Sequence, residues 1–167
     1  MKDKLNRYLK EYLEPQVHKS SFVGAARTCS SLPQEMDYCE ESSITSFIDE
    51  NKEEDTFQTI LFKYIDNKNL KDSDVYNKVN IDRRLFSKIR SNKHYHPSKE
   101  TVILLGIALE LNENEIDELL NSASYSLPYN TEYDLIIRFC FKEGIYNINQ
   151  INEFLYDHNC KTLNKGE

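Results

Sequence analysis

The chain has 167 residues, 39% of them hydrophobic, and its 28 Asp and Glu side chains against 21 Lys and Arg give a net charge of −7. A chain of this length forms one domain, or one domain with an appendage. The acidic balance excludes a protein that binds nucleic acid over its whole surface, because such proteins are basic overall. The sequence has no apolar run long enough to cross a bilayer and no secretory signal pattern, so we expect a cytoplasmic protein without a membrane partner.

Composition also predicts the fold class. The chain has no Trp, only four Gly and four Pro, and many Glu, Lys, Asn and Leu residues, which favours an all-α protein. The four cysteines are widely spaced and form no close pairs, which is typical of free thiols in a reducing compartment. They are Cys29, Cys39, Cys140 and Cys160.

Residues 1–14 predict a small amphipathic helix that runs from Lys2 to Glu14 and stops before Pro15. A helix this short is marginal in water by itself, so its apolar stripe needs a surface. That surface is either the chain's own domain or a protein partner, including a second copy of the chain. In the second case the candidate partner or dimer contacts are Leu5, Tyr8, Leu9, Tyr12 and Leu13.

Residues 15–54 have the composition of a flexible linker. Serines are scattered through them, Pro33 interrupts them, and no helical or strand period is sustained. A short helical turn near residues 44–48 is the one element that we expect here. The last part of this segment, residues 40–54, is acidic.

Residues 55–127 carry the signals of five successive helices, most of them opened by a capping residue. The first, about 56–68, starts from the capping-box spacing of Asp55 and Gln58. The fourth contains an apolar run at 102–111 and should be the buried central helix, where Gly106 allows close contact. The other three are expected at about 72–79, at 83–91 after Asp82, and from 113 after the capping box of Asn112 and Glu115.

Residues 128–167 predict a helical hairpin and a tail. Its first helix is expected at about 132–142, ended by Gly144, and its second at about 148–157, capped by Asn147. Both helices carry apolar stripes, so the hairpin should pack on the preceding bundle.

The spacing of several short motifs is characteristic of one family. Residues 70–82 form a helix and a turn at Asn80-Ile81-Asp82, and Phe86-Ser87-Lys88-Ile89 lies in the helix that follows. Pro97-Ser98 and then Ile107-Ala108-x-x-Leu111 complete the pattern. With this spacing the block 55–125 resembles the phage-repressor-like helix-turn-helix domain of the XRE/Cro family. The trailing segment YDLIIRFCFKEGIYNINQINEFL also looks like a helical module at the ends of bacterial stress- or defence-associated proteins.

The resemblance implies an all-α fold: a five-helix helix-turn-helix bundle with a C-terminal helical hairpin and a tethered N-terminal helix. It implies a sequence-specific regulator of transcription that binds double-stranded DNA through the recognition helix 83–91. The implied base contacts are Arg83, Arg84 and, one and a half turns further on the same face, Lys88. The implied phosphate contacts are Arg90, Lys93, Ser98 and Lys99.

Departures from the family pattern keep a second hypothesis open. Asp72 stands where repressors often place Gln against the phosphate backbone, and Asp74 is close by. Two carboxylates repel phosphate, and this electrostatic contribution dominates affinity. Tyr76 replaces a small Ala of the family. The alternative is a non-enzymatic adaptor of a bacterial stress or defence system that uses a helix-turn-helix scaffold for protein contact.

Other chemistry has weaker signals. His94 and His96 flank Tyr95, but no third ligand has a spacing typical of zinc sites, and Cys29 and Cys39 are too far apart for a zinc knuckle. The glycines are too few for a phosphate loop, and no nucleophile motif is present. We therefore expect no enzymatic activity, no cofactor and no metal.

Overall fold

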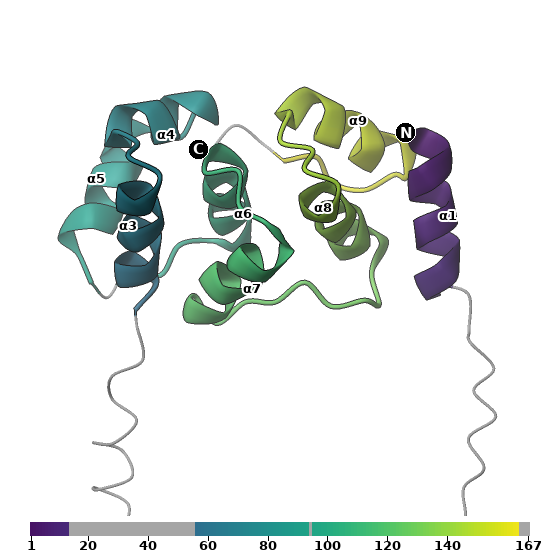
Figure 1. Ribbon diagram of the computed structural model, residues 1–167, viewed down its shortest axis with the longest axis horizontal. Coiled ribbons are helices and arrows are strands. Elements are labelled where there is room, and N and C mark those ends of the chain that lie inside the picture. The colour runs from purple at the N-terminus through teal and green to yellow at the C-terminus, as the bar shows by residue number, and fades with distance from the viewer. Residues whose placement is uncertain (14–55, 94, 164–167) are drawn as a thin grey trace, which may run out of the picture. The chain divides into compact units, whose positions relative to one another are not determined.

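The computed structural model describes residues 1–13, 56–93 and 95–163, which belong to one compact unit. These residues form α-helices and no strands, so the described part of the chain is all-α, as the composition predicts (Figure 1). The helices are α1 (Lys2–Leu13), α3 (Phe57–Asn67), α4 (Asp72–Lys78), α5 (Arg83–Ser91), α6 (Lys99–Ala108), α7 (Glu113–Ser122), α8 (Glu132–Lys142) and α9 (Ile148–Asp157).

Most of these helices begin where a polar side chain satisfies the free N–H groups of the first turn. Asp82 accepts from the backbone of α5 at 2.5 Å, and Asn112 forms a complete capping box with Glu115. The predicted capping box of Asp55 with Gln58 is wrong. The N-cap of α3 is Thr56, whose hydroxyl accepts from the Thr59 N–H.

Helix α6 is the centre of the core, as its uniformly apolar sequence predicts. Every residue from Thr101 to Ala108 is buried. Gly106 faces α7 so closely that a Cβ atom there would collide with the Cδ1 atom of Ile116 and would crowd Phe141 at 3.2 Å. The glycine therefore sets the distance between α6, α7 and α8.

Helix α8 is fastened to α7 by a buried arginine. The Arg138 guanidinium donates to both carboxylate oxygens of Asp117 at 2.9 Å, to Glu113 at 3.0 Å and to the Leu127 carbonyl at 2.9 Å. Burial by itself would lower the pKa of Arg138, but the hydrogen bonds that its guanidinium donates to Asp117 and Glu113 outweigh this effect and raise the pKa. The cation is thus fully paired, which a buried charge requires.

Helix α1 packs on α8 of its own chain. Leu5, Tyr8 and Leu9 are buried there, and the Tyr8 ring lies 5.4 Å from the ring of Phe139. Tyr12, which is 40% exposed, stacks on Tyr129 at 5.1 Å between ring centroids. The sequence left open whether α1 packs on its own domain or on a protein partner, and in the structure it packs on its own domain.

Some expectations lie outside the described residues. The linker at 15–54, its helical turn at 44–48, Cys29, Cys39, Asp55 and His94 all fall there. None of the helices that the structure describes is both long and apolar enough to cross a membrane.

Candidate nucleic-acid interface

Helices α4 and α5 are joined by a four-residue turn that bends the chain sharply. Asn80 adopts the left-handed conformation with φ of 53°, which Asn tolerates better than most residues. Ile81 then enters the core at 4% exposure, and its N–H donates to the Tyr76 carbonyl at 2.9 Å. The Tyr76 ring packs 5.6 Å from the ring of Phe86, so the larger side chain is accommodated between the two helices.

A surface groove of about 400 Å³ runs between α4 and α5. Arg83 and Ser87 of α5 line it, together with Asp72 of α4 and Lys71 directly before α4. The remaining lining residues are Ser73, Tyr76, Phe86 and Arg90. The groove therefore brings cations, hydroxyl groups and the aromatic rings of Tyr76 and Phe86 together on one face.

The six charged or polar positions of α5 do not all share this face. Arg83, Ser87 and Arg90 line the groove, whereas Arg84 and Lys88 do not. Arg84 and Lys88 are four residues apart and are neighbours on the helix surface. Arg83 and Lys88 are five positions apart, which places them well apart around the helix. Arg83 therefore lies on the groove side of α5, and Arg84 and Lys88 lie together on another part of its surface, while the base contacts implied for all three stay a prediction.

Arg90 does not present a free cation to a phosphate. Its guanidinium is hydrogen-bonded to the carboxylate of Asp72 and lies over the Phe62 ring, 4.6 Å from its centroid. Its backbone carbonyl accepts from the side-chain amide of Gln58. Arg90 therefore ties α5 to α3 and α4, and it neutralises the carboxylate that would repel a phosphate.

The other implied phosphate contacts differ from one another. Lys93 is exposed and has no ion pair among the described side chains. Lys99 is half-buried and paired with Asp134 at 2.6 Å. The Ser98 hydroxyl caps α6 by accepting from the Thr101 N–H at 3.2 Å. Lys93 thus has the free charge that phosphate binding needs, and Lys99 does not.

Three cations of α5 remain available. Arg83 and Arg84 are exposed and make no ion pair with any described residue. The ammonium of Lys88 lies over the Tyr95 ring at 4.7 Å, a contact that orients it without cancelling its charge. These are the three side chains that the resemblance implies as base contacts.

Charge is strongly divided along the described chain. Residues 56–99 carry ten Lys and Arg side chains and four Asp and Glu side chains. Residues 100–163 carry three Lys and Arg side chains and eleven Asp and Glu side chains. The described residues as a whole are neutral, with 17 charged side chains of each sign. The net charge of −7 therefore comes from the residues outside them, and within the neutral described unit the segment 56–99, which contains α5, is basic.

Several features of this surface were not predicted from the sequence. Lys71 lines the groove together with Arg83. The sequence feature that could have identified it is its position directly before the second helix of the XRE/Cro-like pattern. The pairing of Asp72 with Arg90 joins residues 18 positions apart and had no sequence signal. Phe62 and Tyr95, on which Arg90 and Lys88 rest, were also missed as parts of this surface.

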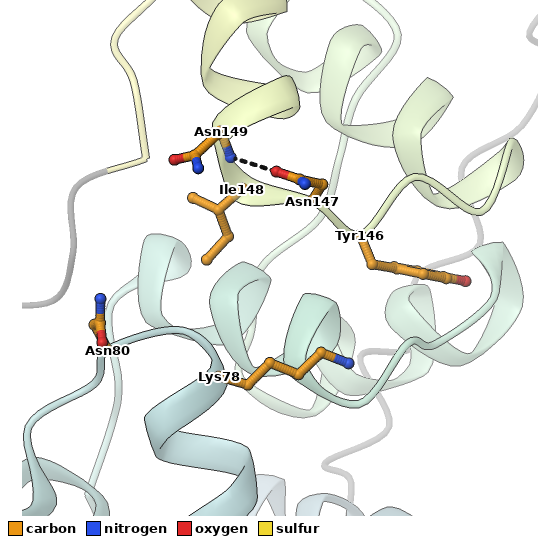
Figure 2. Close-up of a pocket in the computed structure, with 6 residues that line it drawn as sticks. All are labelled: Lys78, Asn80, Tyr146, Asn147, Ile148 and Asn149. Carbon is orange, nitrogen blue, oxygen red and sulfur yellow. Dashed lines mark hydrogen bonds between the residues drawn. The ribbon is translucent and has the colours of Figure 1, made fainter.

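A second pocket, of about 310 Å³, separates the α4–α5 turn from the start of α9 (Figure 2). Its polar groups are largely occupied. The Asn147 side chain accepts from the Asn149 N–H at 3.0 Å, and Tyr146 donates to the Leu111 carbonyl at 2.9 Å. Lys78 is paired with Glu110 at 2.5 Å and lowers the pKa of that carboxyl. These contacts serve helix capping and packing.

No group of three or more His, Cys, Asp or Glu side chains comes together among the residues that the structure describes. His96 is exposed, and its ring lies 5.1 Å from that of Tyr125.

Comparisons of the chain with protein-family models, with curated proteins and with solved structures found no match.

Proposed function

We propose that the protein is a sequence-specific regulator that binds double-stranded DNA in the cytoplasm, with α4 and α5 acting as a helix-turn-helix and α5 as its recognition helix. The observation that carries the proposal is that Arg83 and Arg84, at the start of α5, are exposed and form no ion pair with another described residue. Arginine at the start of such a helix matches the O6 and N7 acceptors of guanine in the major groove.

The charge pattern supports the same proposal. The two carboxylates at the start of α4 were the main argument against phosphate binding, and Arg90 neutralises Asp72. The basic segment 56–99 supplies a local positive field even though the whole chain is acidic. Lys71, Lys88 and Lys93 add exposed cations around the two arginines.

A protein-interaction adaptor is the second candidate. It is favoured by the ion pairs that hold Arg90 and Lys99, because they leave fewer cations for phosphates than the family pattern implies. On this proposal Arg83 and Arg84 contact an acidic protein partner instead of DNA.

Selection of duplexes from a random-sequence pool tests the regulator proposal. The wild-type chain should enrich a defined motif that contains guanine, and Arg83→Ala or Arg84→Ala should relax the preference at particular base pairs, by about 1–3 kcal/mol each. Lys93→Ala should weaken binding to all sequences alike. Selection that returns no motif with the wild-type chain favours the adaptor.

A further inference from the structure

Helix α1 lies on α8 as a bound peptide lies in its binding site. Leu5 and Leu9 are 1% and 5% exposed, and Tyr8 lies against Phe139. A 12-residue helix is not stable alone in water, so α1 is held in its helical form by this contact. The apolar face is thus complementary to the surface of α8.

Charges at one end of α1 fix its direction on this surface. The ammonium of Lys2 lies 2.7 Å from both Glu153 and Asp157 of α9, and Lys4 pairs with Glu143 just after α8. At the other end Tyr12 stacks on Tyr129. The surface therefore recognises an amphipathic helix with lysines at its N-terminal end and an aromatic ring at its C-terminal end.

The covalent link between α1 and the rest of the unit is long. The 43 residues from 14 to 56 separate α1 from α3. Fully extended, such a chain reaches about 140 Å, many times the distance between packed helices. The link therefore allows α1 to reach either the α8–α9 surface of its own chain or the same surface of a second chain.

We propose that the α8–α9 surface is a helix-binding site that takes α1 in trans as well as in cis, so that two copies of the chain exchange their α1 helices. A tether of this length holds α1 at an effective concentration on the order of millimolar. The cis form dominates in dilute solution, and the exchanged dimer forms as the protein approaches that concentration. This inference is independent of DNA binding.

A labelled peptide of residues 1–13 serves as the probe for a second copy's α1. Its binding is measured by fluorescence anisotropy against the full chain carrying Leu9→Asp, which cannot dock its own helix. We expect at least about tenfold tighter binding to this variant than to the wild type, whose own α1 competes. Asn6→Asp is the matched control, because Asn6 is exposed and the same charge there leaves α1 docked.

Sedimentation of the wild-type chain gives a second readout that needs no variant. It should be monomeric at about 10 μM and partly dimeric near 1 mM, whereas the Leu9→Asp chain stays monomeric throughout. Failure of the peptide to bind a folded Leu9→Asp chain would overturn the inference. So would a wild-type chain that remains monomeric up to millimolar concentration.

Discussion

The carboxylate of Asp72, at the start of α4, is hydrogen-bonded to the guanidinium of Arg90, near the end of α5. This pair removes one negative and one positive charge from the face on which Arg83 lies. If α4 lies against the DNA backbone as proposed, the pair leaves no unpaired Asp72 carboxylate to repel a phosphate.

Asp72→Asn should strengthen DNA binding for two reasons, because it removes a negative charge and frees the Arg90 guanidinium for a phosphate. The affinity should rise, and the slope of log K against log salt should steepen by about one unit, as for one added phosphate contact. Asp74→Asn is the matched control, because it removes a neighbouring charge that pairs with no arginine of the described residues. Equal effects of the two substitutions would show that Arg90 gains no contact. Both should change the free energy of unfolding by no more than about 1 kcal/mol.

Arg138→Met should destabilise the protein by about 3 kcal/mol, because it breaks a buried ion pair and leaves the Leu127 carbonyl without its donor. Chemical denaturation followed by circular dichroism measures the change. Lys142→Met, at an exposed position of the same helix, is the control and should cost less than about 0.5 kcal/mol. A loss at Arg138 as small as the control's would mean that Asp117 and Glu113 do not hold α8 on α7.

Gly106→Ala should cost about 1–3 kcal/mol, because the new methyl group collides with Ile116. Ile116→Val removes the colliding Cδ1 atom, so the double variant should lose less stability than the sum of the two single changes. Thermal unfolding of the four proteins measures this coupling. Additive losses would show that α6 and α7 move apart instead of clashing.

The thiol of Cys140 should be protected from alkylation at pH 8, since burial raises its pKa to about 12 and the thiolate is the reactive form. Cys160 is only half-buried and should react first, although burial also raises its pKa. Peptide mapping after iodoacetamide treatment separates the two. Because the folded state holds the Cys140 proton more tightly, this group stabilises the fold below about pH 9, and that stability is lost as pH rises towards 12. Alkylation of both thiols at equal rates in the native protein would contradict this.

The helices could be predicted well from the sequence because their start signals are local. Ser98, Asn112 and Asn147 each cap the helix that follows them, and the cap and the helix lie within four residues of each other. The start of α3 was misplaced, because Thr56 and Asp55 are both good caps and adjacent. Local pattern does not choose between them.

The candidate site could be predicted only in part. Arg83 and Arg84 were found because the motif spacing places them at the start of a helix. Asp134 lies 35 positions from Lys99, and its ion pair depends on how α8 packs, for which no local signal exists. The docking of α1 was likewise undecided, since an amphipathic stripe predicts burial but not the surface that provides it.

The most direct test of the central claim is a titration of duplex DNA with the full chain at about 50 and 200 mM salt. The proteins are the wild type, the Arg83→Ala/Arg84→Ala double variant and Arg7→Ala, an exposed arginine of α1 without an ion pair among the described residues. With five exposed cations around α5, the wild type should give a slope of log K against log salt of about −4, and the double variant should lose about two units of it. Arg7→Ala should match the wild type. Wild-type protein that shows no salt-sensitive binding at micromolar concentration, or a double variant that binds as the wild type does, would contradict the claim that α5 binds DNA.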